Sequence, residues 1–459
     1  MLNLLTLKDA LSTFTSVLLA ILMLLLMITV HEFGHYIAGK IFKFKINEFA
    51  IGMGPALFRR TNKKTGEIFS IRLLPLGGYC SFEGEDAEND SPDAFNNKAP
   101  WKRIIVLVSG AFMNFITGIL VLCLSIGIYG QLVFKANEIK LDLSPEYSGY
   151  SLESGDSIIK IDGKNIYMSS DISSCLNGKK KGDIVDVQVV NEKGQKENRK
   201  VRLRNDVSSE NIGDVIPSFT ALGISTIDCV TAVTENSQII VGDYLLRLCD
   251  DEDYQKCTRI YSAQDLVSAY RQKSAGEEFS FYVGKGANEH RIISVTVKAN
   301  ASDMTNENVL EELGFTTTSS KINAYTLNHK FNFFESIGRG FEYSFIVAGT
   351  IFRTLGELLT GKLGLSTVGG PITTISMTSS IIKTGGFNYF LEMAGFIGVN
   401  LAVFNLLPIP ALDGSRVLFC IIESIRKKPL NRKVEGLIHG IGLVALLGFS
   451  ILVDLLQLF

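Results

Sequence analysis

The chain is short of charge, cysteine and histidine for its length. Of its 459 residues, 20% are charged, whereas a typical soluble domain has about 25%. Seven cysteines without a C-x-x-C pair exclude a disulfide-dense miniprotein. A net charge of −2 excludes a broadly basic surface, so no nucleic-acid partner is expected. The 46% apolar share excludes a disordered chain, and a collagen-like Gly-X-Y period is missing as well.

The missing charge is explained by four apolar runs. Residues 11–30, 104–128 and 393–412 contain no charged side chain, and in residues 437–459 the only acidic or basic group besides a histidine is Asp454. About 20 apolar residues in a helix span the ~30 Å hydrocarbon core of a bilayer. We therefore predict a polytopic α-helical membrane protein with four transmembrane helices and the lipid bilayer as its partner. A cleaved signal peptide is the alternative for the first run, but no A-x-A-like site follows it.

Positive charge gathers in two segments, and this sets the expected orientation. The segment 36–103 carries eleven Lys or Arg residues, and five more lie close together in 426–433. Short loops of this kind stay in the cytoplasm. Both termini and the long segment 131–385 are then expected outside the cytoplasm.

The stretch between the second and third runs reads as a soluble, β-rich insert. A weak internal repeat relates residues 154–161 to residues 241–248, which predicts two similar modules at 131–220 and 221–325. The pattern GD-x-I-x-x-I resembles PDZ domains, which capture extended peptides and peptide C-termini by β-strand addition. A pair of purely structural β-domains is the alternative.

The remaining chain divides into a membrane core and one segment that is hard to place. The core is expected in two halves, 1–130 and 386–459, with the segment 326–385 outside the cytoplasm between the insert and the third run. That segment is apolar but broken by charges such as Arg339 and Glu357. An interfacial amphipathic helix is therefore favoured over a fifth membrane span.

The first run continues into His31-Glu32-Phe33-Gly34-His35. Residues four apart lie on one helix face, so His31 and His35 can hold one metal ion together. Glu32 lies one step round the helix, where it can reach a metal-bound water. Two unrelated helix-end histidines are the alternative, but ionisable residues beside a membrane span are costly without a use.

A third metal ligand is expected from the other end of the chain. A catalytic zinc site usually has three protein ligands, and Asp413 follows the third run in the segment 405–414, NLLPIPALDG. The first and third spans run in the same direction, so both reach the same membrane boundary at their C-terminal ends. A fifth span would place His31 and Asp413 on opposite faces. His439 is a rival ligand, because it lies early in the fourth span near the same side.

These two motifs together are characteristic of one family. HEFGH in a first span and NLLPIPALDG after a third resemble the intramembrane zinc metalloproteases of the site-2 protease family, peptidase family M50. The bacterial regulator-of-sigma-E protease type, with a PDZ insert between spans two and three, is the nearest form. Further matches include LLPLGGY at 73–79, NNKAPWKR at 96–103 and GGPI at 369–372. The second span reads SGAFMN at 109–114, where the family more often has a glycine followed by a proline. We expect this difference to have little effect on catalysis.

The resemblance implies Zn²⁺ held by His31, His35 and Asp413, with Glu32 as the general base. It implies single-span membrane proteins as substrates, either an anti-sigma factor or signal-peptide remnants, in regulated intramembrane proteolysis. It also implies the cytoplasmic (inner) membrane of a bacterial cell as the location, with the active site near the cytoplasmic side.

A substrate helix must unwind before it is cut, and each freed backbone group then needs a new partner. The resemblance supports Asn400 and Asn405 in gripping the unwound substrate, and we assign Pro408 and Pro410 of the same motif to substrate binding with them. Contact between the enzyme's own helices is the alternative for the two asparagines.

A second feature that can hold an unwound substrate precedes the second span. The segment 67–80 reads as a strand that ends in a glycine turn. Its edge, with Leu74, Gly77 and Gly78, can pair with an extended substrate. A merely structural hairpin is the alternative.

The PDZ-like modules are expected to act as a size filter that admits pre-trimmed substrate stubs, with capture of a new peptide C-terminus as the alternative. A membrane-anchored scaffold with structural zinc and a transporter are the competing functions. Glu32 beside the metal favours the protease over the scaffold, and the missing inverted repeats disfavour the transporter. Cys249 and Cys257 can pair if their compartment is oxidising.

Overall fold

The chain forms two compact units in a computed structural model. Met1–Gly130 and Lys330–Phe459 make up the first unit, and Gln131–His329 make up the second. The structure describes residues 2–85, 91–136, 147–208, 215–224, 226–234, 238–249, 257–260, 262–286, 289–298, 301–322, 324–361, 364, 368–428 and 430–458.

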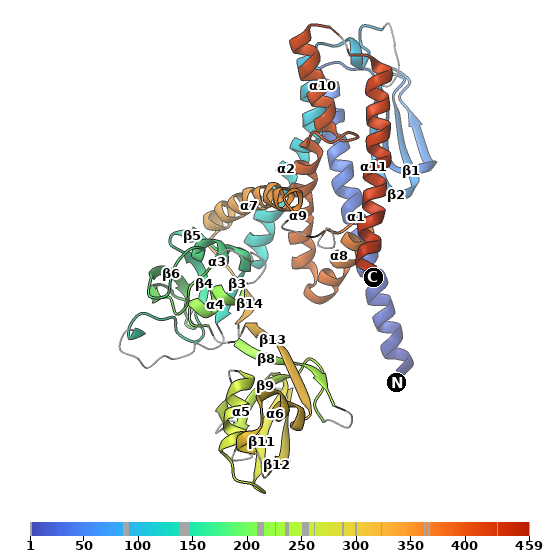
Figure 1. The fold of residues 1–459 in the computed structure, drawn as a ribbon. Helices are drawn as coiled ribbons and strands as arrows, with labels where there is room; N and C mark the ends of the chain where they lie inside the picture. Colours follow the sequence, from blue (N-terminus) through green and yellow to red (C-terminus); the bar gives the residue numbers. More distant parts are fainter. Residues whose placement is uncertain are drawn as a thin grey trace. The chain divides into compact units, whose positions relative to one another are not determined.

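The first unit is a bundle of helices. In its described part, four helices are long and apolar enough to cross a membrane, which confirms the four predicted spans. The apolar segments of these helices are Leu11–Ile41, Pro100–Tyr129, Phe387–Leu406 and Lys433–Gln457. Figure 1 shows α1, α2 and α9 packed against one another, with α11 beside them. The helices of the unit are α1 (Leu2–Ile41), α2 (Pro100–Tyr129), α7 (Phe333–Leu359), α8 (Pro371–Gly385), α9 (Phe387–Leu406), α10 (Asp413–Arg426) and α11 (Arg432–Leu458).

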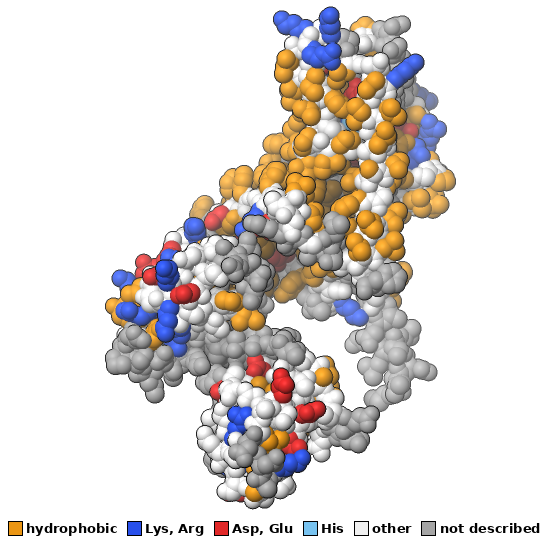
Figure 2. Space-filling model, in the orientation of Figure 1, with side chains coloured by type: hydrophobic (Ala, Val, Ile, Leu, Met, Phe, Trp, Pro, Cys, Tyr) orange, Lys and Arg blue, Asp and Glu red, His pale blue; other side chains and the backbone are white. Residues whose placement is uncertain are grey.

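The outward face of this bundle is apolar. Leu18, Leu22 and Leu26, spaced four apart on α1, are 44%, 47% and 55% exposed. Figure 2 shows hydrophobic side chains over the visible face of the helices, with Lys and Arg gathered at the end where α10 and α11 meet. Apolar surface of this extent needs a bilayer to cover it.

Two helix boundaries differ from those predicted. α1 continues to Ile41, so HEFGH lies inside the helix and not at its end. α9 ends at Leu406, before the predicted end at 412. Leu407 has φ −66° and ψ 142°, the extended conformation that a following proline imposes. Pro408 and Pro410 keep the next residues out of a helix until α10 begins at Asp413.

A small antiparallel sheet follows α1. It consists of β1 (Ile46–Thr61) and β2 (Ile68–Phe82), with a short 3-10 helix, η1 (Phe95–Asn97), after it. Both strands fold back on themselves, so residues 46–51 pair with 68–71 on one side and with 78–82 on the other. Gly52 and Gly77 stand at the two bends with φ of 84° and 94°, where a side chain would be strained.

The fold of this sheet sharpens the predicted strand at 67–80. Its first part, 68–72, lies inside the sheet, because 46–51 and 56–61 flank it. Its last part, 78–82, is an edge segment whose only partner among the described strands is β1. A segment of chain can therefore be added only beside 78–82 or beyond 56–61.

The predicted amphipathic segment forms α7. Arg339 is buried on its inner face, where its guanidinium lies 3.9 Å from the centre of the Phe331 ring. Phe341 and Phe352 are exposed on its outer face. By length and composition α7 is not among the four candidate spans of the described chain, and Figure 1 shows it running across α2 and α9. Its location at the membrane surface stays a prediction.

The second unit contains two sheets with one strand order, which confirms that a β-rich region is inserted between the spans. In the first sheet the order is β14-β3-β4-β6-β7, and in the second it is β13-β8-β9-β11-β12. The predicted sequence repeat falls on β4 and β9, the third strand of each sheet. The first sheet contains β3 (Gln131–Ala136), β4 (Ser157–Ile161), β5 (Lys164–Asn165), β6 (Ile184–Val190), β7 (Lys196–Arg202) and β14 (Ala324–His329), with α3 (Ser169–Leu176) and α4 (Ile216–Ala221) beside it. The second contains β8 (Thr226–Val233), β9 (Tyr244–Cys249), β10 (Thr258–Arg259), β11 (Glu278–Gly286), β12 (Glu289–Thr296) and β13 (Phe315–Ile322), with α5 (Ala263–Gln272) and α6 (Asn306–Glu312).

The repeat carries the same buried ion pair in both sheets. Asp156 precedes β4 and pairs with Arg199, and Asp243 precedes β9 and pairs with Arg291. Each aspartate is 1% exposed, so each needs its arginine partner. Because β14 pairs with β3, the chain returns to the first sheet after completing the second, and the predicted boundary at 325 falls inside β14. Cys249 and Cys257 form a disulfide in the second sheet.

Candidate active site

The two histidines of HEFGH meet inside the bundle. His31 and His35 lie on the face of α1 that packs against α2, and they are 6% and 7% exposed. Their Nε2 atoms are 3.0 Å apart. Gly34 lets the helices approach, because a Cβ there would lie 2.3 Å from the Ser109 carbonyl oxygen. The helix spacing thus turns two side chains toward one point.

Asp413 reaches the same point from the first turn of α10. Its Oδ2 atom lies 2.9 Å from His31 Nε2 and 3.3 Å from His35 Nε2. The turn before it is tight, because a Cβ on Gly414 would lie 2.3 Å from the carbonyl oxygens of Leu406 and Leu407.

The three atoms fit a zinc ion. Among the described residues, His31, His35 and Asp413 form a group whose ligand atoms all lie within 4.8 Å of one another. A tetrahedral zinc site with bonds of about 2.0–2.1 Å places its ligand atoms roughly 3.3 Å apart. His35 Nδ1 lies 2.8 Å from the Val106 carbonyl oxygen. An Nδ1–H that donates there leaves the Nε2 lone pair free for a metal, which is the usual arrangement of a ligand histidine.

His31 is positioned by two asparagines. Asn114 of α2 and Asn405 of α9 each place an amide nitrogen 3.4 Å from His31 Nδ1. Asn114 is fully buried, and its Oδ1 atom has no hydrogen-bond partner in the described chain. Rotating this amide by half a turn exchanges its oxygen and nitrogen. The oxygen then accepts from His31 Nδ1–H, which frees His31 Nε2 for the metal.

Asn114 belongs to the segment 109–114, and sequence reasoning did not single it out as a functional residue. A Cβ on Gly110 would lie 2.5 Å from His35 Nε2 and 2.8 Å from His31 Cε1. Gly110 therefore lies against both imidazole rings, whereas the effect of Ala111 in place of a proline stays a prediction. An asparagine inside an otherwise apolar membrane run was the signal that could have revealed Asn114.

This contact leads to a prediction for Asn114. We expect Asn114→Leu to weaken zinc binding by about 10- to 100-fold, the usual effect of losing a hydrogen bond to a ligand histidine. Asn114→Asp should keep most of the affinity, since a carboxylate also accepts from Nδ1–H. Zinc competition with a chromogenic chelator measures both variants. Equal affinity of wild type and Asn114→Leu would contradict the assigned contact.

Glu32 lies beside the metal group and is held by the sheet. Its Oε2 atom accepts a 2.9 Å hydrogen bond from the Cys80 backbone N–H of the edge segment 78–82. Gly78 packs under it, since a Cβ there would lie 3.6 Å from Glu32 Cγ and 2.9 Å from the Ala50 carbonyl oxygen. The predicted base is thus fixed between α1 and the edge segment.

A polar cavity of about 390 Å³ opens beside these groups. Its wall combines the metal group, Glu32 and the edge segment with Glu85 and Arg416, which form an ion pair. Cys80 also lines it. Burial, followed by the nearby Glu32 and Glu85, raises the pKa of the Cys80 thiol, and Cys80 is not part of the metal group found among the described residues. The cavity opens directly beside the three ligand atoms.

The residues predicted to bind substrate are spread over a wider area. Gly78 and Asn405 are within reach of Glu32 and His31, as described above. Asn400, further along α9, has a buried Oδ1 atom without a hydrogen-bond partner in the described chain. Leu74 is 48% exposed and, like the bend at Gly77, lies at the Met53 end of the sheet.

The proline turn is held by the fourth span. The Ala411 backbone N–H donates to His439 Nδ1 over 3.1 Å, and a Cβ on Gly442 would lie 2.3 Å from Pro410. Ala411 has a φ of 83°, so the turn needs such support. His439 is not part of the metal group found among the described residues. The rival ligand thus serves as a hydrogen-bond acceptor that positions the turn before Asp413.

Two helix-borne histidines with an intervening glutamate, completed by an aspartate inside a bundle of apolar helices, define a membrane-embedded metallopeptidase. Residues 19–449 match peptidase family M50, so the chain belongs to that family and is an intramembrane zinc metalloprotease. The family match also favours the protease over the two competing functions, a transporter and a membrane-anchored scaffold with structural zinc.

Relatives named as proteases match along almost the whole chain. The regulator of sigma E protease of Haemophilus influenzae is 27% identical over 94% of this chain and 96% of its own length. The regulator of sigma-W protease RasP of Bacillus subtilis is 26% identical over 94% of this chain and 95% of its own length. A protein of Clostridium perfringens that is named as a candidate zinc metalloprotease is 27% identical over 96% of this chain and 97% of its own.

Proposed function

We propose that this protease hydrolyses a peptide bond within or beside the transmembrane helix of single-span membrane proteins. The observation that carries the proposal is the position of the metal group and Glu32 next to a strand edge inside a bundle of membrane-spanning helices. The names of the Haemophilus and Bacillus relatives as sigma-regulating proteases support an anti-sigma type of substrate. Signal-peptide remnants are a second substrate of the same chemistry.

The proposed mechanism assigns one role to each group. When bound, zinc would act as a Lewis acid toward the scissile carbonyl and would lower the pKa of a water molecule toward neutrality. His31, His35 and Asp413 would hold the metal, and Glu32 would accept a proton from the attacking water and deliver it to the leaving amine. The Cys80 N–H aims the Glu32 carboxylate toward the cavity. Asn405 lies beside His31 Nδ1, and the unpaired Asn400 Oδ1 can accept from a backbone N–H of the unwound substrate.

The edge segment 78–82 is the proposed docking strand for the unwound substrate. Its Cys80 and Phe82 N–H groups point away from β1 and donate to Glu32 and Glu85. A substrate strand added at this edge takes over the Glu85 position, and the Arg416 ion pair then opens. Strand addition satisfies the backbone groups that unwinding exposes.

Gly78 provides a test of this docking strand. We expect Gly78→Val to lower cleavage by about 100-fold, since a misplacement of about 1 Å at the reacting centre has that effect. Zinc content should stay at the wild-type level, because the three ligand atoms lie on α1 and α10. Gly127→Val serves as the control, as a Cβ at Gly127 meets nothing within 4 Å. Full activity of Gly78→Val would contradict docking at this edge.

The orientation is part of the proposal. Both termini and the β-rich insert lie outside the cytoplasm, and the site lies near the cytoplasmic side of a bacterial cell membrane. The Lys and Arg residues at the end of the bundle where α10 and α11 meet support it (Figure 2). Labelling of single cysteines introduced at exposed Lys63 and Lys193 with a membrane-impermeant reagent tests the two sides.

We further propose that the insert is a pair of PDZ-like modules that act as a size filter. One strand order, one repeat and one buried ion pair in both sheets support two copies of a single module. A folded domain on the outer side of a substrate collides with these modules, whereas a trimmed stub does not. Capture of a peptide C-terminus by strand addition is the alternative.

Two substrates that differ only in an outer folded domain separate these roles. We expect the purified protease in detergent to cleave the trimmed substrate at least about 10-fold faster than the full one, and a chelator to abolish both reactions. Replacing residues 131–329 by a flexible linker should remove the difference. If the linker variant still cleaves the trimmed substrate faster than the full one, the size-filter proposal is wrong. If the linker variant no longer cleaves the trimmed substrate but still cleaves the full one, capture of the C-terminus is favoured.

A further inference from the structure

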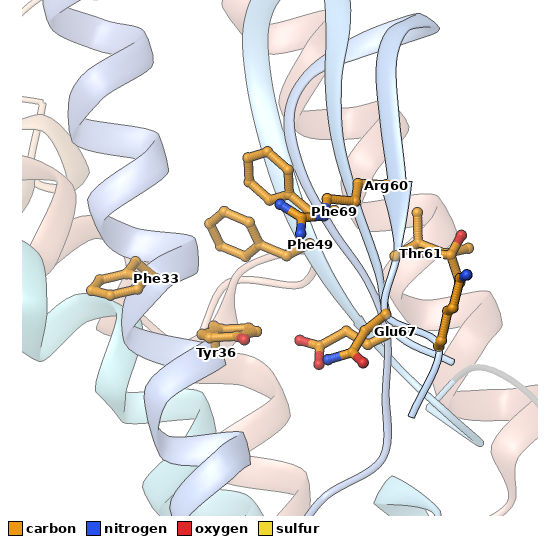
Figure 3. Close-up of a pocket in the computed structure, with 10 residues that line it drawn as sticks. Phe33, Tyr36, Phe49, Arg60, Thr61, Glu67 and Phe69 are labelled. Carbon is orange, nitrogen blue, oxygen red and sulfur yellow. The ribbon is translucent and has the colours of Figure 1, made fainter. Parts of the chain in front are cut away.

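A second cavity lies on another side of α1. It has a volume of about 590 Å³ and is lined by the C-terminal part of α1, by β1 and β2 and by the turn that joins the two strands. None of its lining residues lines the catalytic cavity. Figure 3 shows Phe33 and Tyr36 on the helix facing Phe49 and Phe69 on the sheet, with Arg60 next to Phe69.

The inner wall of this cavity is aromatic. The ring centres of Tyr36 and Phe49 are 5.4 Å apart, and the rings of Phe49 and Phe69 stack with centres 6.1 Å apart. Phe33 and Phe69 remain 44% and 38% exposed. Exposed aromatic side chains at the end of a membrane span are typical of the layer where lipid headgroups meet hydrocarbon.

The rim of the cavity is cationic. Glu67 is its only acidic lining residue, and Lys40 neutralises it in an ion pair. Arg60 and Lys63 are exposed, and neither has an ion-pair partner among the described residues. Thr61 and Asn62 add hydrogen-bonding groups between them. The rim thus presents two unbalanced positive charges above an aromatic wall.

We propose that this cavity binds one anionic phospholipid, with the headgroup phosphate at Arg60 and Lys63 and the glycerol and upper acyl chains against Phe33 and Phe69. The cavity lies at the end of the candidate span Leu11–Ile41, at the depth where a headgroup is available. Basic pockets beside membrane helices select anionic headgroups. A water-soluble anion would satisfy the rim but leave the aromatic wall exposed, and a zwitterionic lipid would bring a second cation to the rim.

Native mass spectrometry of the full, zinc-loaded chain in detergent tests this proposal. The probe is phosphatidylglycerol, compared with phosphatidylcholine of the same acyl chains and with glycerol phosphate. The wild type should bind one phosphatidylglycerol, and phosphatidylcholine and glycerol phosphate should each bind at least about 10-fold more weakly. Arg60→Gln/Lys63→Gln should weaken phosphatidylglycerol binding by about 30-fold, since each cation near a lipid surface contributes about 5-fold.

The neighbouring pair Arg59→Gln/Lys64→Gln is the matched control, because both residues are exposed and basic but do not line the cavity. Its phosphatidylglycerol binding should stay within about 2-fold of the wild type. Equal losses in the two double variants, or equal binding of phosphatidylcholine, would overturn the proposal. So would displacement of the lipid by a single-span substrate, because the cavity would then belong to the substrate path.

Discussion

Replacing Glu32 by glutamine is expected to lower the cleavage rate by about 10²- to 10⁴-fold, the usual contribution of a general acid–base. The amide cannot accept the proton of the attacking water, whereas its size preserves the contact with the Cys80 N–H. Zinc should remain bound at wild-type stoichiometry, because Glu32 is not one of the three ligand groups. Single-turnover cleavage of a labelled substrate, with zinc measured in the same sample, gives both quantities.

Glu357→Gln is a matched control for this variant, since Glu357 also lies on a helix but does not line the catalytic cavity. It should cleave at the wild-type rate. A Glu32→Gln protein that retains full activity would show that another group moves the proton. Loss of zinc in this variant would instead make Glu32 part of the metal site.

Replacing Asp413 by asparagine is the second large effect, and it should act on the metal. Asn lacks the negative charge that offsets the ion, and the loss of a ligand should exceed the 10- to 100-fold cost of losing a neighbour of a ligand. We therefore expect zinc affinity to fall by at least about 100-fold and cleavage to fall with it. Metal analysis after dialysis against a weak chelator measures the affinity.

Two variants control for general damage to the fold. Asp454→Asn removes another membrane carboxylate, which accepts hydrogen bonds from the Ile372 and Thr373 backbone N–H groups at the start of α8. It should retain zinc although α8 is less well held. His439→Ala should also retain zinc while the turn at Ala411 loosens. If Asp413→Asn keeps its zinc and His439→Ala loses it, the rival ligand is the correct one.

The metal group could be predicted because it rests on two simple periodicities. The four-residue spacing of His31 and His35 is a property of any helix, and the depth of Asp413 follows from the alternating direction of four spans. Neither inference needs side-chain packing. The first helix ends later than predicted and the third ends earlier, but the three residues still lie at the same level of the bundle.

The surroundings of the metal group could not be predicted in the same way. Asn114 reaches His31 only because Gly34 and Gly110 let α1 and α2 pack closely, and that contact depends on the rotation of both helices. The hydrogen bond from Cys80 to Glu32 depends on β2 folding back at Gly77, a bend that an alternating pattern does not reveal. The pairing of β14 with β3 joins residues on either side of the whole second sheet.

The central claim is that this zinc protease cuts inside the membrane. The most direct test is to reconstitute it in proteoliposomes with a single-span substrate and to map the cleaved bond by mass spectrometry, with Glu32→Gln as the negative sample. We expect one main cut within the apolar segment or at its cytoplasmic end, absent from Glu32→Gln and from the chelated enzyme. A cut confined to the soluble part of the substrate, or a cut that persists in both negative samples, would contradict the claim.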